Sequence, residues 1–245
     1  MTERPFYVNP FRVVSPKVDA EVLRLRELRA ERVSESTTLQ EGLLIMIGKL
    51  IEVAEALSHC VFTCDKSVMD HCESLAEEVD EEEKTLTRYL ISSGVSGDMM
   101  RGIIRFPYRL ERIGDLLETI LHCCRVKARD SVEFSHEANE ELNRLFGTLL
   151  DTMLSLREGF VSPNESLLQS IIAQGQRLAK MVDDSRSAHW ERIEGDICTL
   201  TASSTYREIL DSINWINEYL IKMATTLLEL GVKMAESESS VQENA

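Results

Sequence analysis

The recurrence of apolar residues constrains the fold of this chain more than any other sequence feature. Apolar side chains return every three or four positions, the spacing that places them on one side of an α-helix. The pattern runs through six long stretches, at about 37–62, 67–91, 99–126, 137–158, 165–194 and 204–233. Only five prolines occur in 245 residues, and alternating β-branched runs are few. The sequence therefore predicts an all-α chain.

The connections divide the six predicted helices into two sets of three. SGVSGD at 93–98 is a loop by its glycines and serines, residues 128–136 form a break, and SPNE at 162–165 combines a turn with a helix cap. Short connections make consecutive helices antiparallel neighbours. We expect two tandem antiparallel three-helix bundles, at 37–127 and 137–233.

The repeated order of three helices, a break and three helices suggests an internal duplication. In that register Ile113 corresponds to Ile216 and Leu117 to Leu220. Outside the two sets we expect an N-terminal extension, 1–36, with a short amphipathic helix at 18–34. The acidic, serine-rich tail at 234–245 has the composition of a disordered segment.

Charge and hydropathy limit the classes of partner. The net charge is −15 and the pI about 4.8, which argues against nucleic-acid binding, since that requires clustered Lys and Arg. The charge fits a cation binder or a protein that meets basic surfaces, and it also fits solubility alone. No secretion signal opens the sequence and no apolar run is long enough to insert in a membrane, so we expect a cytoplasmic protein with reduced cysteines.

The stretch RLERIGDLLE at 109–118 is unusual for an ordinary solvated helix. Glu111, Asp115 and Glu118 fall on one face, where like charges four residues apart cost about 0.2–0.5 kcal/mol a pair. Gly114 between them costs about 1 kcal/mol relative to alanine. We expect the glycine to permit close approach of another helix.

A second group of acids lies in the preceding helix, in EEVDEEE at 77–83. Antiparallel packing brings this run, and Glu52 of the first helix, level with Glu111 and Asp115. Such oxygen-rich clusters suit Mg, Ca or Mn, and iron and zinc also accept carboxylates. The alternative is a solvated acidic face.

Several of these stretches resemble the PhoU family of phosphate-uptake regulators. LERIGD at 110–115 is similar to the family's helix-three signature, MIGKLIE at 46–52 to its helix-one pattern, and MDHCESLAE at 69–77 to its helix-two segment. The resemblance implies two three-helix bundles side by side, with six main helices. It also implies a homodimeric cytosolic adaptor between a phosphate transporter component and a sensor histidine kinase.

The resemblance further implies where a metal would bind. The residues at the family's motif positions in the first set are Asp70, Glu77, Glu111 and Asp115. The second set has Asn214 and Glu218 at the motif positions, so Glu218 is the weaker candidate there. Because some members hold iron or zinc and others only magnesium or no metal, we expect no required cofactor and a possible divalent Fe, Zn, Mg or Mn ion.

Cysteines and histidines gather at one end of the predicted first set. An up-down-up arrangement brings together the end of the first helix, the start of the second and the end of the third. The residues there are Cys60, Cys64, Cys72, Cys123, Cys124, His59, His71 and His122. Zinc or iron binding, a thiol switch and ordinary core packing are the open interpretations.

Catalysis is not predicted. The sequence has no phosphate-cradling glycine-rich loop and no nucleophile motif. A carboxylate-bridged metal enzyme would need Glu-x-x-His on two helices, and the nearest match, Glu118 and His122, is one residue too long. The remaining alternative is a soluble partner of a sodium/phosphate cotransporter.

Overall fold

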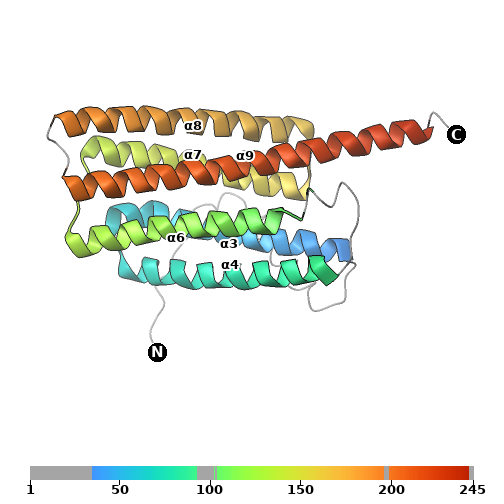
Figure 1. Cartoon of the computed structure of the whole chain (residues 1–245), viewed down its shortest axis with the longest axis horizontal. Helices are drawn as coiled ribbons and strands as arrows, with labels where there is room; N and C mark the ends of the chain where they lie inside the picture. The colour runs from blue at the N-terminus through green and yellow to red at the C-terminus, as the bar shows by residue number, and fades with distance from the viewer. Residues whose placement is uncertain (1–34, 93–101, 103, 196–198, 243–245) are drawn as a thin grey trace.

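The computed structural model describes residues 35–92, 102, 104–195 and 199–242. Within these ranges the regular structure is entirely helical: α3 (Glu35–Thr63), α4 (Lys66–Ser92), α6 (Phe106–Asp130), α7 (His136–Val161), α8 (Glu165–Glu194) and α9 (Leu200–Gln242) (Figure 1). The predicted all-α fold class is confirmed. Residues 1–34 of the expected extension, with its short helix, lie outside the described part of the chain.

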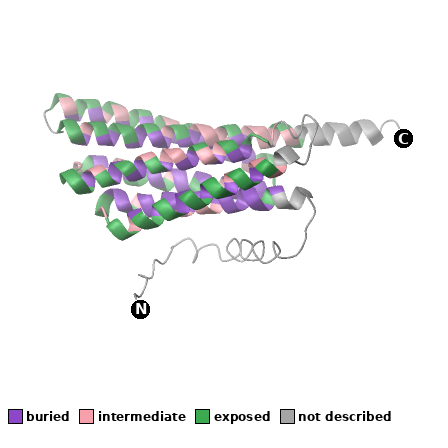
Figure 2. Ribbon diagram, turned by 60° about the horizontal axis from the view of Figure 1, so that its bottom comes forward, coloured by how far each residue is buried: buried purple, intermediate pink, exposed green. Residues whose placement is uncertain are grey.

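The helices pack as two sets of three. α3, α4 and α6 contact one another, α7, α8 and α9 do the same, and the sets meet along α6–α9 and α3–α7 (Figure 1). A continuous apolar core runs through both sets, so that Ile113 and Ile213 belong to one cluster. Phe106 of α6 packs edge-on against Phe160 of α7, with ring centroids 5.1 Å apart. Figure 2 shows the buried residues lining the inner sides of the helices.

The start of α6 differs from the predicted start near residue 99. The described helix begins at Phe106, with Pro107 in its first turn. Proline is tolerated there because its missing N–H would be unpaired anyway, whereas farther inside a helix its ring collides with the preceding turn. Pro107 therefore sets the boundary, and Met99 itself lies outside the described residues.

Both ends of α9 also correct the sequence prediction. The helix begins at Leu200 rather than Ser204, because Thr199 Oγ1 accepts a hydrogen bond from Ala202 N at 3.2 Å and caps it. It continues to Gln242, through most of the tail at 234–245 that was expected to be disordered. The tail contains neither glycine nor proline, and extending an existing helix avoids the unfavourable nucleation step.

The tight connections position the helix ends. Only Cys64 and Asp65 join α3 to α4, and Asp65 Oδ1 accepts from Ser67 N at 2.8 Å. The predicted turn and cap before α8 are confirmed, because Asn164 Oδ1 accepts from Leu167 N at 2.8 Å. No helix in the described ranges combines the length and hydropathy that a membrane span requires.

Candidate functional site

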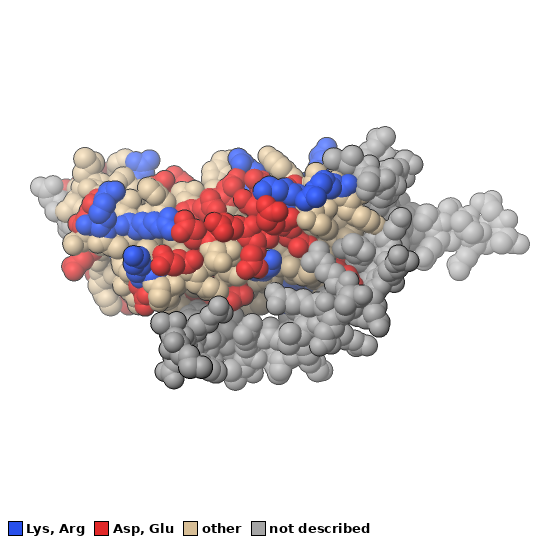
Figure 3. Space-filling view, turned by 90° about the horizontal axis from the view of Figure 1, so that it is seen from below, with Lys and Arg blue, Asp and Glu red and all other residues tan. Residues whose placement is uncertain are grey.

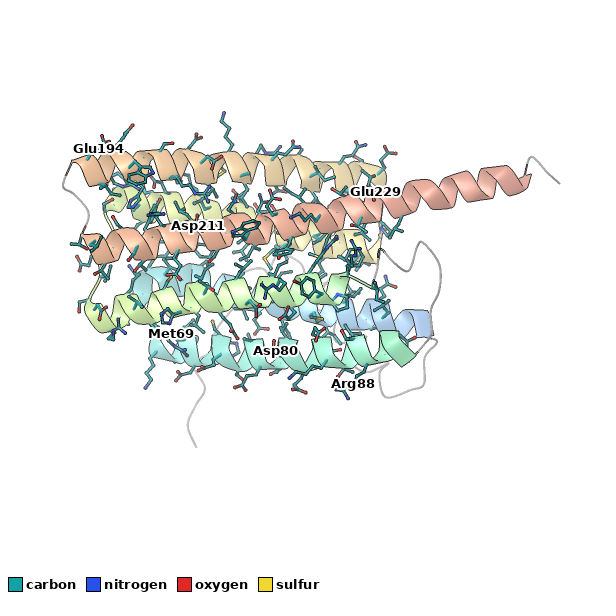
Figure 4. The ribbon with its side chains drawn as sticks, viewed as in Figure 1. Met69, Asp80, Arg88, Glu194, Asp211 and Glu229 are labelled. Atoms are coloured by element: carbon teal, nitrogen blue, oxygen red, sulfur yellow. The ribbon has the colours of Figure 1, made fainter. Side chains whose placement is uncertain are left out.

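Six carboxylates from two neighbouring helices form one surface, which we call the acidic face. α4 contributes Glu73, Asp80 and Glu83, and α6 contributes Glu111, Asp115 and Glu118. Figure 3 shows a band of acidic side chains with basic groups toward its two ends. Asp80 lies near the middle of α4 (Figure 4). The face follows from helix geometry, because the opposite side of α6 carries the buried Leu110, Ile113 and Leu117.

The carboxylates interact strongly enough to perturb one another. Partial burial raises the pKa of Glu111, and the charges of Asp115, Glu83 and Asp80 raise it further. Partial burial also raises the pKa of Glu118, with added repulsion from Asp80, Asp115 and Glu73. Both shifts mean that the ionised forms are less favourable in the folded chain than in water. A positive charge brought to this face would relieve that repulsion.

Two arginines offset part of the negative charge. Arg112 Nη1 lies 2.6 Å from Asp115 Oδ2, and Arg125 Nη2 lies 2.8 Å from Glu73 Oε2. All four side chains are about half exposed, and such pairs contribute little to stability. Six carboxylates against two paired arginines leave an excess of negative charge that can attract a cation or a basic protein surface.

The residues predicted as metal ligands are spread over this region. Glu111 and Asp115 belong to the acidic face, whereas Asp70 and Glu77 are exposed residues of α4. Glu218 Oε2 on α9 lies 3.6 Å from Lys222 Nζ. In the described part of the chain, no three His, Cys, Asp or Glu side chains are placed so that they could hold a metal ion. The metal-ligand assignment stays a prediction.

The expected meeting of Glu52 with the acids of α6 is replaced by a different contact. Glu52 Oε1 lies 3.3 Å from His71 Nε2, between α3 and α4. One side of α4 therefore contacts α3, and another side contacts α6. The α4 acids whose charges act on Glu111 are Asp80 and Glu83, two members of the acidic run at 77–83.

Comparisons with known proteins identify the architecture. No family model and no curated protein matches the sequence. The crystal structure of the phosphate transport system regulatory protein PhoU from Streptococcus pneumoniae superposes with a TM-score of 0.68, 13% identity, and coverage of 87% of this chain and 96% of that one. PhoU from Pseudomonas aeruginosa superposes with a TM-score of 0.74, also at 13% identity, over 81% of this chain and 98% of that one. This chain has the PhoU fold.

Within this PhoU fold, Gly114 does not have the packing role expected of it. It is buried on α6 and faces α3 and α4. A Cβ built at Gly114 would lie 3.7 Å from Leu50 Cδ2 and 3.8 Å from Val79 Cγ1, which is ordinary van der Waals contact. The helices do not approach closely enough there to exclude a methyl group.

The cysteine and histidine end of the first set is only partly assembled as predicted. Cys60, Cys72 and Cys124 are buried, and Cys60 Sγ donates to Asp65 O at 3.9 Å. Cys123 points instead toward Glu208 of α9, where burial raises its pKa to about 12. The three histidines, His59, His71 and His122, are exposed. Because the thiols are buried and the imidazoles are exposed, the described residues do not assemble a mixed Cys/His metal site at this end.

The second set contains a buried polar cluster that was not predicted from the sequence. Arg192 of α8 donates from Nη1 and Nη2 to the two oxygens of Glu141 of α7, at 2.8 Å each. Tyr206 of α9 donates its hydroxyl to Glu141 Oε2. These contacts raise the pKa of Arg192, and burial followed by the bond to Glu141 raises that of Tyr206. One group from each helix therefore meets at a single point.

His189 lies against the same cluster. His189 is 2% exposed, and its ring centroid lies 4.8 Å from that of Tyr206. Among the described residues, neither ring nitrogen has a hydrogen-bond partner. Burial lowers its pKa, and the charges of Arg192 and Arg207 lower it further. A sequence signal existed for this cluster, because His189 and Arg192 continue the buried helical stripe of α8.

Proposed function

We propose that this chain is a non-enzymatic, cytoplasmic regulator of phosphate uptake and phosphate signalling. It acts as a homodimeric adaptor between a phosphate transporter component and a sensor histidine kinase. The observation that carries the proposal is an acidic face displayed on a PhoU fold. The fold alone does not specify a function, and the face supplies a surface with a defined chemical preference.

The acidic face suits a partner with exposed Lys or Arg. Its carboxylates are crowded, as the raised pKa values of Glu111 and Glu118 indicate, so a basic surface gains attraction and relieves repulsion together. The face is formed by two long helices packed side by side, which offers an extended and rigid docking surface. Complementary charge on a docking surface speeds association and favours the correct partner.

Charge reversal on the acidic face tests this function. Asp80→Lys combined with Glu118→Lys changes one exposed residue on each helix of the face. Asp184→Lys combined with Glu191→Lys makes the same change in charge on exposed residues of α8 and serves as the matched control. We expect tagged wild-type and control proteins to recover a transporter component and a histidine kinase from the native host. The acidic-face variant should lose at least about tenfold of that recovery.

Three other outcomes of this recovery experiment would change the proposed function. Equal recovery by both double variants would remove the acidic face from the proposal. Recovery of metabolic enzymes alone would contradict the adaptor function. A sodium/phosphate cotransporter in place of the kinase would identify the chain as a cotransporter partner.

We also propose that the acidic face binds a divalent cation through Glu111 and Asp115, with Asp70 and Glu77 as further candidates from the family resemblance. Elemental analysis of tag-free protein, beside the Glu111→Ala/Asp115→Ala variant, tests the site. A near-stoichiometric metal that disappears in the variant is the expected result. Metal retained in the variant, or absent from both proteins, contradicts the assignment.

A further inference from the structure

One side of α3 is buried although the described helices pack on its other sides. Glu41, Ile45, Gly48, Glu52 and Glu55 recur every three or four residues, so they share one side of the helix, which we call the fourth side. Glu41, Ile45 and Glu55 are 3%, 6% and 1% exposed, and the other two residues are half-buried. A helix side that faced water would leave its carboxylates exposed.

The contacts of α3 show that the fourth side faces away from its neighbours. Among the described helices, α3 packs mainly against α4, α6 and α7. Gly42 faces α4, Leu50 faces α6, and Gln40 Nε2 donates to a backbone carbonyl of α7 at 2.9 Å. Glu41 comes nine residues before Leu50, which is about two and a half turns. Glu41 therefore lies on the opposite side of α3 from α6.

The chemistry of the fourth side indicates what kind of segment covers it. Three of its five residues are acidic and none is basic. In the described part of the chain, Glu41 Oε1 has no hydrogen-bond partner, and a buried carboxylate without one is unfavourable. A Cβ built at Gly48, in the middle of this side, would meet no described atom within 4 Å. The fourth side therefore suits an apolar helix that approaches closely and supplies a cation near Glu41.

The segment at 18–34 has these properties. It belongs to the longest part of the chain outside the described ranges, and it is joined directly to the start of α3. Val18, Val22 and Leu25 recur at helical spacing, and Arg29 and Arg32 continue the same stripe. As a helix the segment would be about 25 Å long, whereas the fourth side extends over about 21 Å. One stripe thus offers apolar residues first and arginines last.

We propose that residues 18–34 dock as a helix on the fourth side of α3, antiparallel to it. Because the segment ends where α3 begins, this direction places Arg29 and Arg32 near Glu41 and the apolar part of the stripe over Ile45 and Gly48. Helices joined by a short connection pack in this way. The first set is then a four-helix unit. Its fourth side is closed to other proteins, so that a basic partner meets the acidic face of α4 and α6 instead.

Limited proteolysis of the native full-length protein tests the docking from the side of the segment. Trypsin can cut the segment after Arg24, Arg26, Arg29 and Arg32, but only where the backbone is released. We expect these cuts to be at least about tenfold slower than in a synthetic peptide of residues 15–36. Leu25→Asp places a charge in the docked stripe and should remove most of the protection. Leu23→Asp makes the same change on the opposite side of the segment and should keep it.

Two glycine variants test the docking from the side of α3. Gly48→Tyr has room among the described helices but blocks the approach of the segment, so the tryptic cuts should become fast. Gly147→Tyr is the matched control, because Gly147 is exposed on α7 and a Cβ there also meets no described atom within 4 Å. Its segment should stay protected. Far-ultraviolet circular dichroism should show unchanged helix content in both variants.

Four results overturn the proposal. These are equal cleavage of the native protein and the peptide, equal cleavage of the two leucine variants, equal cleavage of the two glycine variants, and protection that is lost on dilution. The last result would assign the cover to a second copy of the chain. Each of these outcomes leaves the adaptor proposal intact, because that proposal depends on the acidic face.

Discussion

The two helix sets place their ionisable groups differently. In the first set, the six carboxylates of the acidic face lie at the surface of α4 and α6, and the side of α6 that faces α3 and α4 carries buried apolar residues. In the second set, Glu141, Arg192 and Tyr206 are drawn into the junction of three helices. The acidic face of the first set thus keeps its charges available to a partner, although Glu41, Glu55, Glu82 and Lys127 of the same set are buried. The second uses them to determine how its own helices pack.

The same contrast appears at equivalent positions of α6 and α9. In the register that pairs Ile113 with Ile216, Gly114 of α6 corresponds to Asn217 of α9, and both are buried. Asn217 Nδ2 donates to Gly175 O of α8 at 2.8 Å. The second set therefore has a polar anchor and a close helix contact where the first has neither.

Among the substitutions predicted to alter stability, removal of Arg192 from the buried cluster should have the largest effect. Arg192→Met leaves the Glu141 carboxylate buried without its cation, which costs about 3–5 kcal/mol in the free energy of unfolding. Urea denaturation measures the change. Arg125→Met breaks the exposed pair with Glu73 and should cost about 1 kcal/mol or less. Similar losses in the two variants would contradict the distinction between the sets.

Alanine substitution of two buried glycines, one from each set, sharpens the comparison. A Cβ at Gly175 would lie 2.5 Å from Ile221 Cγ1 and 2.9 Å from Asn217 Oδ1, so Gly175→Ala should destabilise the protein by about 1–3 kcal/mol. Gly114→Ala has room for its methyl and should be neutral or stabilising by up to about 1 kcal/mol. Thermal unfolding of both variants checks the order, and a larger loss for Gly114→Ala would refute the packing argument.

The second set should also make stability depend on pH on the acid side of neutrality. The pKa of His189 is lowered below its usual 6.5, so the unfolded chain binds more protons than the folded one as pH falls through that value. Stability contributed by neutral His189 is therefore lost on acidification. We expect the difference in stability between pH 7 and pH 5 to shrink in His189→Leu. An unchanged difference would assign the pH dependence to other groups.

A carboxylate of the acidic face should make stability depend on pH with the opposite sign. This effect on stability should be smaller than those predicted for the Arg192, glycine and His189 variants. The pKa of Glu118 is raised above 4.5, so the folded chain retains a proton that the unfolded chain has lost, and stability falls as pH rises through this range. Glu118→Gln should raise the free energy of unfolding at pH 7 by about 0.5 kcal/mol or less, with no gain at pH 3. Urea denaturation at both pH values measures it. Destabilisation at pH 7 would show that the Glu118 carboxylate makes a favourable contact.

Helix content and buried faces could be predicted from the sequence because both depend on local spacing. The predicted limits of α8, Glu165–Glu194, coincide with the structure, and the SPNE cap before it is confirmed. Ile113 and Leu117 are buried, as are Ile216 and Leu220. The late start of α6 was also readable from Pro107, whose effect on a helix is local.

Only the tertiary structure decided which distant side chains meet. Asp70 lies ten residues before Asp80, which is about 15 Å along α4, so the height at which the two helices pack selects Asp80 and Glu83 as the α4 acids that act on Glu111. Glu141 and Arg192 are 51 positions apart, and no local pattern links them. Chain topology brought several cysteines and histidines to one end of the first set, but only the packing of the helices buried Cys60, Cys123 and Cys124 and left His59, His71 and His122 exposed.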